Sequence, residues 1–401
     1  MWNEKSKQLV ADGKLVVIGV VQEQHAERAQ LYKQWKQYDF PIAQDSITGL
    51  GLAVVPVPVL IDEYGYVLSA RPKIGELEKL VARKTDAVAP APVLDTKHVS
   101  AQWLKANHSK DATASALCAI GDSLLREGTT ESVKEAINYY QKSDTAAVSK
   151  KDKQLKGSIM FRLGVAYRSL FDLANESEKD ASDFSNASEF WSRALELNPN
   201  QYIWRRRIQQ YGPRQIKPYP FYDWVGQAQK EIVDRGEVPV ELTVPLSGAE
   251  IARPNRKFET TASAESNPDP SGKIDRDEQG LVKFHATVVP QKVVPGKTVR
   301  VHLRFEPEAS HWNNEAEGMV VWIDDSDNGA SSNSKLTHAN AKEASSDEAR
   351  MMEFEFQADR AAKGEVELKG YALYYVCTSQ DGECLYRRQD FSITVPVDSK
   401  K

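Results

Sequence analysis

The chain has 401 residues, of which 41% are hydrophobic and 27% are charged, and its formal net charge is −5. This composition is typical of soluble globular proteins, the length predicts about two to three domains, and the negative charge argues against nucleic acid as the main partner. No apolar run reaches the roughly 18 residues of a membrane-spanning helix, and the first residues lack the apolar core of a secretory signal. The sequence therefore predicts no membrane span and contains no visible export signal.

Residues 1–85 read as an α/β segment. The apolar run 13–21 predicts a parallel strand buried on both faces, because its hydrophobic residues are continuous rather than alternating. A helix over about 29–36 should follow. Residues 54–62 then predict a second strand with an antiparallel return strand, and a closing helix is expected over about 75–83.

Pro56 lies six residues before Asp62, with Gly65 just beyond. With this order of elements, the segment resembles the carboxy-terminal two-thirds of a thioredoxin-like redoxin of the peroxiredoxin and cytochrome-maturation type. The resemblance implies that the Val55–Pro56 bond is cis and that the backbone of these two residues docks substrates. It also implies a Cys-x-x-Cys pair on an earlier helix, which this sequence lacks; residues 2–11 resemble the end of that helix.

The strand that precedes this helix is central in the family's sheet. Without it, the remaining strands should be separated and should bury little apolar surface. Two explanations stay open. Either the protein starts upstream of Met1, which would also supply an export signal, or the segment is a non-catalytic remnant in which Pro56 is an ordinary strand-initiating proline.

Residues 86–98 are rich in Ala and Pro and predict a linker, and helices are expected to dominate residues 99–236. Two groups of residues resemble the helices of a tetratricopeptide repeat. They are Met160, Leu163, Gly164 and Tyr167 in the first helix and Ala187, Trp191, Ala194 and Pro199 in the second. A less regular unit surrounds Gly121 and Tyr140, and Cys118 on its apolar face should be buried.

Two such units are fewer than the roughly three that an independent repeat array needs, so these helices should rest on a neighbouring domain. The resemblance implies a peptide or protein partner on the helices. A plain spacer bundle is an equally acceptable interpretation of the same pattern.

After a connecting segment, residues 237–280, the chain changes to short alternating runs. Six strands are expected, over 282–289, 298–305, 319–323, 351–356, 366–375 and 391–395, and 240–246 offers another. In the second run, Val299, Val301 and Leu303 alternate with polar residues, which predicts one buried and one wet face. Residues 281–398 therefore predict a β-sandwich.

Cys377 and Cys384 flank a turn at residues 380–382 that follows an aromatic and β-branched strand. The two sulfurs should face each other across a hairpin, as a disulfide or an exchangeable dithiol, since the third cysteine lies far away on a helix. Arg387 and Arg388 are candidates to stabilise a thiolate. Whether the bond carries electrons or is a structural staple stays open.

The Val294-Pro295-Gly296 turn, the sandwich pattern, and the cysteine pair followed by Tyr386 and another strand resemble a known domain. This is the amino-terminal, immunoglobulin-like domain of the thiol-disulfide interchange reductase (DsbD) of bacterial cell envelopes. The resemblance implies that Cys377 and Cys384 accept electrons and pass them to envelope oxidoreductases. The spacing of the pair is one residue longer than in the family.

The predicted fold class is thus multidomain: a partial thioredoxin-like fold, a short TPR-like module and an immunoglobulin-like β-sandwich. We expect thiol-disulfide exchange with thioredoxin-like or other thiol-containing proteins, in the periplasm or cell envelope, because disulfides persist in oxidising compartments. The alternative is a non-catalytic scaffold with a structural disulfide. We expect no cofactor and no metal, since Lys335 occupies the glutamate position of the calcium-loop-like run 324–329.

Overall fold

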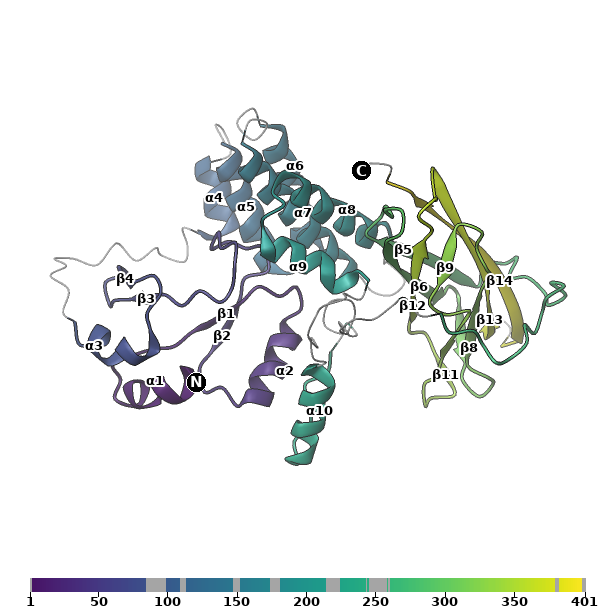
Figure 1. Ribbon diagram of the computed structural model, residues 1–401, viewed down its shortest axis with the longest axis horizontal. Helices are drawn as coiled ribbons and strands as arrows, with labels where there is room; N and C mark the ends of the chain where they lie inside the picture. Colours follow the sequence, from purple (N-terminus) through teal and green to yellow (C-terminus); the bar gives the residue numbers. More distant parts are fainter. Residues whose placement is uncertain are drawn as a thin grey trace. The chain divides into compact units, whose positions relative to one another are not determined.

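The computed structural model describes residues 2–83, 99–108, 113–146, 152–173, 181–213, 224–242, 244, 258, 260–378 and 382–398. The chain is a mixed α/β multidomain protein with ten α-helices and several sheets in the described residues (Figure 1). It forms two compact units. Unit 1 comprises Met1–Ala166, Arg193–Arg207 and Tyr222–Leu246, and unit 2 comprises Tyr167–Ser192, Ile208–Phe221 and Ser247–Lys401.

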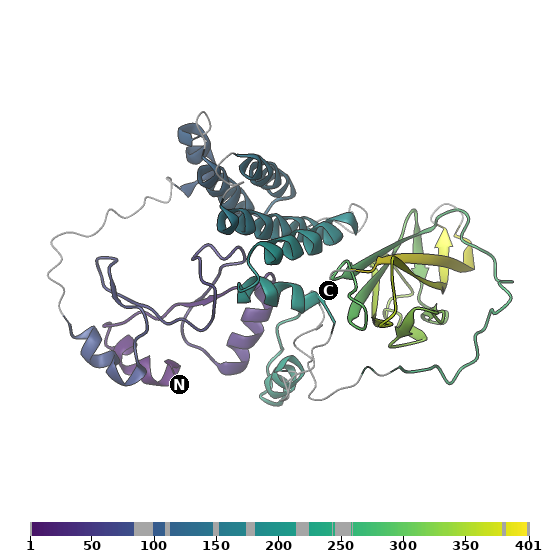
Figure 2. The same ribbon diagram turned by 45° about the horizontal axis from the view of Figure 1, so that its top comes forward.

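The first segment, residues 2–83, belongs to unit 1 and has small elements. In chain order these are α1 (Trp2–Ala11), β1 (Gly19–Val21), α2 (Ala26–Lys36), β2 (Ile42–Gln44), β3 (Leu60–Ile61), β4 (Val67–Ser69), the 3₁₀ turn η1 (Ile74–Glu76) and α3 (Leu77–Val81). Strands β1 and β2 form a parallel pair, and β3 and β4 form a separate antiparallel pair (Figures 1 and 2). The expected separation of the strands is therefore confirmed.

The two-sided burial expected for residues 13–21 is wrong. Only the last three residues of this run form a strand, and the side chains of Val16 and Ile18 are 78% and 60% exposed. The strand expected over 54–62 is likewise reduced to Leu60–Ile61. The physical reason is the lack of neighbours: a buried parallel strand needs paired strands and covered faces, and β1 pairs only with β2 among the described strands.

The first segment obtains part of its core from a helix far along the chain. Leu31 and Trp35 of α2 pack with Val225 and Ile232 of α10 (Trp224–Asp234). The indole Nε1 of Trp35 also donates a 2.6 Å hydrogen bond to Glu231. Because α10 supplies this apolar face, α2 is buried although its sheet is small.

The helical middle of the chain contains α4–α9, as the sequence predicted. They are α4 (Ala101–His108), α5 (Ala114–Glu127), α6 (Thr130–Thr145), α7 (Lys153–Leu173), α8 (Ala181–Leu197) and α9 (Tyr202–Tyr211). Gly121 of α5 lies against the ring of Tyr140 of α6, where a Cβ atom would collide with that ring. Asp122 accepts hydrogen bonds from Tyr140 (2.9 Å) and Arg162 (2.8 Å), so it links α5, α6 and α7. Cys118 is buried, as expected.

In unit 2, residues 281–398 form two antiparallel sheets packed face to face, which we call the sheet stack. One sheet has the order β5-β6-β12-β9, with β5 (Val282–Val289), β6 (Thr298–Pro307), β12 (Arg350–Ala358) and β9 (Gly329–Ser331). The second, the cysteine sheet, contains β7 (Ser310–Asn313), β8 (Met319–Ile323), β10 (Lys335–His338), β11 (Ser345–Ser346), β13 (Glu365–Thr378) and β14 (Cys384–Pro396). The six expected strands are present; 240–242 form no strand, and residues 243 and 245–246 lie outside the described part.

Alternating residues of both sheets meet in one continuous core. Val301 and Phe305 of β6 and Phe356 of β12 face Val321 of β8 and Tyr374 of β13, and all are buried. In the cysteine sheet, β13 pairs with β14 along one edge and with β8 and β7 along the other. This places β13 in the interior of the sheet and fixes which of its residues face outward.

The wet face expected for β6 is not exposed. Arg300 and Arg304 are buried, although they alternate with the core residues as predicted. Helical residues of unit 2 lie against this face: His302 Nε2 lies 2.8 Å from the carbonyl oxygen of Tyr211, and the guanidinium of Arg304 lies over the ring of Phe171. The prediction that the helices rest on a neighbouring domain is therefore confirmed for this part of the chain.

Candidate functional site

Cys377 and Cys384 form a disulfide, as the sequence predicted, at the end of the long β13–β14 hairpin. The two residues are direct cross-strand partners. The amide of Thr378 donates to the carbonyl oxygen of Glu383 at 2.9 Å, and Gly382 has a φ of 65°, which favours glycine in the turn. The hairpin register thus aligns the two sulfurs.

The disulfide lies on the outer face of the cysteine sheet. Side chains alternate along a strand, and Tyr374 and Val376 of β13 are in the core, so Tyr375 and Cys377 point to the other face. Their partners Tyr386 and Cys384 on β14 share this outer face. The pair is therefore displayed on a surface of the stack, outside its core.

The two cysteines differ in accessibility. Cys377 is only 5% exposed, whereas Cys384 is exposed. An incoming thiolate must reach the sulfur that it attacks, so Cys384 is the sulfur open to attack from solvent. Cys377 then becomes the leaving group.

A pair of stacked tyrosines lies beside the disulfide. The rings of Tyr375 and Tyr386 are 4.5 Å apart, one cross-strand step along the outer face from the cysteines. Burial, a hydrogen bond to Glu317 and the negative charge of that carboxylate raise the pKa of Tyr375. These neutral rings form an apolar platform next to the exposed sulfur of Cys384.

His311 is the neighbour of Cys377 on the side opposite Cys384. Ser310–Asn313 form β7, which was not among the expected strands, and His311 pairs directly with Cys377. Its role beside the cysteine was missed, because β7 is a four-residue strand whose pairing with β13 spans 66 sequence positions.

Arg387 and Arg388, the expected candidates to stabilise a thiolate, contact carboxylates in this structure. Arg388 donates to Asp269 at 2.9 Å and to Asp390 at 2.7 Å, and its guanidinium lies 3.7 Å from the ring centroid of Tyr371. Arg387 pairs in register with the core residue Tyr374. The strand alternation therefore turns Arg387 to the other face, and carboxylates already engage Arg388.

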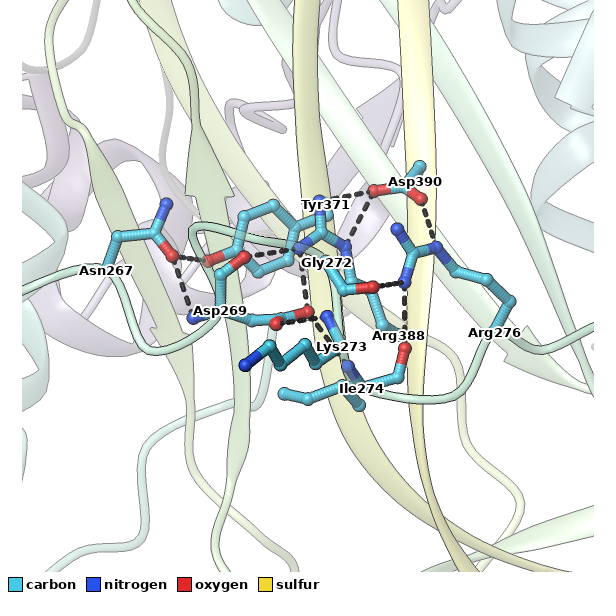
Figure 3. Close-up of polar contacts among 9 residues, drawn as sticks. All are labelled: Asn267, Asp269, Gly272, Lys273, Ile274, Arg276, Tyr371, Arg388 and Asp390. Atoms are coloured by element: carbon cyan, nitrogen blue, oxygen red, sulfur yellow. Dashed lines mark hydrogen bonds and ion pairs between the residues drawn. The ribbon is translucent and has the colours of Figure 1, made fainter.

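Residues 260–276, which we call the strap, cross the outer face of the cysteine sheet. Figure 3 shows Asp269 at their centre: its carboxylate accepts from the amides of Lys273 and Ile274 and from Arg388. Nearby, Arg276 donates to Asp390 at 2.5 Å. The strap covers a patch formed by Trp322, Tyr371 and Leu373. Part of the connecting segment 237–280 is thus bound to the cysteine sheet.

Burial of the Asp269 carboxylate opposes its charge. Hydrogen bonds from Arg388 and from the amides of Lys273 and Ile274 outweigh this burial and lower its pKa below the usual value for aspartate. The strap is therefore held by a charged anchor that is ionised at neutral pH.

The expected docking residues Val55 and Pro56 belong to unit 1, whereas the cysteines belong to unit 2. The Val55–Pro56 peptide bond is cis, and both side chains are exposed just before β3. The structure thus brings Cys377 and Cys384 together, and it describes the two docking residues as part of a separate unit.

A groove of about 480 Å³ lies on the helices of unit 1. It is lined by residues of α4, α5, α6 and the turn between α5 and α6, including Lys105, Leu124, Glu127 and Glu135. Lys105 and Glu135 form a 2.7 Å ion pair across it.

No group of three or more potential metal-ligating side chains occurs among the described residues. None of the described helices is long and apolar enough to cross a lipid bilayer.

No family model matches the chain, and no curated protein matches it. Among solved structures, AvmM, which catalyses macrocyclization in alchivemycin A biosynthesis, is 8% identical with a TM-score of 0.16, covering 30% of this chain and 92% of AvmM.

The Pseudomonas fluorescens alkylpurine DNA glycosylase AlkC, bound to DNA containing an abasic site analog, is 11% identical, with a TM-score of 0.14 and 75% of each chain covered. An extracellular fragment of EsaA from Streptococcus gallolyticus is 8% identical with a TM-score of 0.14, covering 71% of this chain and 68% of that one. These scores establish no shared fold.

Proposed function

We propose that this chain is a thiol-disulfide exchange protein of the bacterial cell envelope, which passes electrons between Cys377/Cys384 and thioredoxin-like partners. One observation carries the proposal: the disulfide lies on the outer face of a sheet, and it joins an exposed cysteine to a buried one. A bond that only staples the core has no need of this position.

The geometry favours one order of bond exchange. A partner thiolate attacks the Sγ atom of Cys384, the Cys377–Cys384 bond breaks, and the electron pair passes to the sulfur of Cys377. A second partner thiolate then attacks the partner's own sulfur in the mixed disulfide and releases Cys384 as a thiolate. The partner's dithiol is oxidised to a disulfide, and the Cys377/Cys384 pair is reduced to a dithiol.

The proposal includes a family resemblance for each of three parts of the chain. The sheet stack would be an immunoglobulin-like sandwich resembling the amino-terminal domain of DsbD, and residues 2–83 a partial thioredoxin-like fold with Val55 and Pro56 as docking backbone. The helices would form a TPR-like module, whose groove on α4–α6 would receive a peptide or protein partner. An oxidising envelope compartment agrees with a stable surface disulfide.

Single-cysteine variants test the order of exchange. In a Cys118→Ala background, Cys377→Ser leaves the exposed thiol of Cys384 and Cys384→Ser leaves the buried thiol of Cys377. Each is mixed with a single-cysteine thioredoxin activated as its thionitrobenzoate disulfide, and release of the chromophore is followed. We expect the Cys377→Ser variant to form the mixed disulfide faster. Equal rates, or no reaction with either variant, would overturn the proposed order.

A non-catalytic scaffold is the second candidate. It is favoured because Cys377 and Cys384 are only seven positions apart and close the end of a hairpin that is already paired along β13 and β14. Equilibration with thioredoxin redox couples decides between the two functions. A carrier pair should equilibrate near the thioredoxin potential of about −270 mV, whereas a staple should stay oxidised below about −300 mV.

A further inference from the structure

The pairing of β7 with β13 places one titratable side chain directly beside the buried cysteine. Val376 pairs with Trp312, Cys377 with His311, and Thr378 with Ser310. Directly opposed residues of an antiparallel pair have Cβ atoms about 4.5–5.5 Å apart on the same face. His311 is therefore within reach of the Cys377 sulfur.

The faces of the neighbouring residues agree with this placement. Trp312 and Val376 are buried in the core of the sheet stack, so His311 and Cys377 lie together on the outer face. Cys384 is the partner of Cys377 on the other side. His311 on β7, Cys377 on β13 and Cys384 on β14 thus lie in one row across three neighbouring strands. Cys377, the leaving group, is in the middle.

We propose that His311 is a positioning residue that stabilises the thiolate of Cys377 when the disulfide opens. This inference rests on the proposed function, and it identifies the residue that controls how readily the Cys377 sulfur leaves. When the bond to Cys384 breaks, the electron pair is left on Cys377. An imidazolium at His311 balances that charge, or gives its proton to the sulfur and becomes a neutral imidazole.

The two arginines of the neighbouring strand β14 contact carboxylates: Arg387 lies 3.8 Å from Asp275, and Arg388 donates to Asp269 and Asp390. Tyr375 of β13 and Tyr386 of β14 have raised pKa values, mainly because they are partly buried, and so remain neutral at pH 7. Glu317, which follows β7, accepts the hydrogen bond of Tyr375, and Glu383 precedes Cys384. Among these described neighbours, His311 is the group that becomes a cation on protonation.

The test is the pKa of the Cys377 thiol in the full chain. In the Cys118→Ala, Cys384→Ser background, Cys377 is the single thiol, and its ionisation is followed by thiolate absorbance and by the pH dependence of alkylation. His311→Asn removes the cation, His311→Lys restores a positive charge, and His338→Asn removes an imidazole on β10, which β8 separates from β13.

We expect His311→Asn to raise the pKa of Cys377 by about one unit, as loss of a nearby opposite charge does. His311→Lys and His338→Asn should leave this pKa close to that of the parent variant. With both cysteines present, His311→Asn should slow opening of the disulfide, because a leaving thiol with a higher pKa leaves more slowly.

An unchanged Cys377 pKa in His311→Asn, or an equal increase in His338→Asn, would overturn the inference. Failure of the proposed function is a different result. If the wild-type disulfide does not exchange with thioredoxin, the function is wrong, whereas the thiol titration still decides the role of His311.

Discussion

The first segment and the sheet stack both contain apolar runs that predict buried strands, and the two regions reach opposite outcomes. Val16 and Ile18 lie in a continuous apolar run and are largely exposed, whereas Val299 and Val301 lie in an alternating run and are completely buried. In the first segment the sheet is split into two pairs of strands, while β6 has a partner on each side. An apolar run therefore becomes a buried strand only where other strands and a facing layer complete it.

Isolated pairs of strands are marginal in water, and burial against another element is what stabilises them. In the first segment this element is a helix: α10 covers α2, and Leu9, Leu60 and Leu77 form a second small cluster. The sheet stack instead closes its core between its own two sheets. Four predictions, which together use six substitutions, can break or sharpen this comparison.

The largest effect is expected from truncating the core of the sheet stack. Phe305→Ala removes a fully buried ring and should lower the free energy of unfolding by about 3–5 kcal/mol. Ile18→Ala in the first segment removes a side chain that is mostly in water and should change it by at most about 0.5 kcal/mol. Urea unfolding of both variants measures the difference, and similar losses would show that Ile18 is buried in solution.

Truncation of Trp35 tests whether the first segment depends on α10. The side chain is buried against Val225 and Ile232 and donates to Glu231, so Trp35→Ala should cost about 3 kcal/mol. Hydrogen exchange should increase in both α2 and α10 and stay unchanged in the sheet stack. An increase in hydrogen exchange confined to α2 would contradict a core shared by α2 and α10.

Two glycine-to-alanine substitutions, one in the sheet stack and one in the first segment, compare how tightly these regions are packed. A Cβ atom at Gly370 of β13 would meet the carbonyl oxygen of Trp322 and the ring of Phe391, so Gly370→Ala should destabilise by about 1–3 kcal/mol. A Cβ atom at Gly75 meets nothing within 4 Å, so Gly75→Ala should be neutral or slightly stabilising. Thermal unfolding of the two variants measures both effects, and a stable Gly370→Ala variant would mean that β13 and β8 are farther apart.

The smallest effect concerns the outer face of the cysteine sheet, which the strap covers in part. Asp269 has a lowered pKa in the folded chain, so its contribution is complete above the unfolded aspartate value of about 3.9 and is lost as the pH falls through the folded value. Hydrogen exchange of residues 260–276, corrected for its intrinsic pH dependence, should therefore reveal opening of the strap at acidic pH.

Asp269→Asn is the matched control for this titration. The amide cannot ionise, so the strap of this variant should open more readily at pH 7 and should lose the acid transition. An unchanged acid transition in Asp269→Asn would assign the pH dependence to another group.

The sequence by itself determined the local features of this protein. The cysteine pairing followed from three cysteines and one turn, the six long strands of the stack from their alternation, and the helical middle from its periodicity. These features depend on residues that are close in the chain, where backbone geometry leaves few arrangements.

Only the tertiary structure decided which apolar residues are buried, which charged faces are covered and which side chain stands beside Cys377. Arg304 is buried where its guanidinium lies over Phe171, a helical residue of unit 2, and His311 is the partner of Cys377 because a four-residue strand pairs with β13 in one register. Contacts of this kind join residues far apart in the chain. Strand order and register set them, and a shift of one residue would turn each side chain to the opposite face.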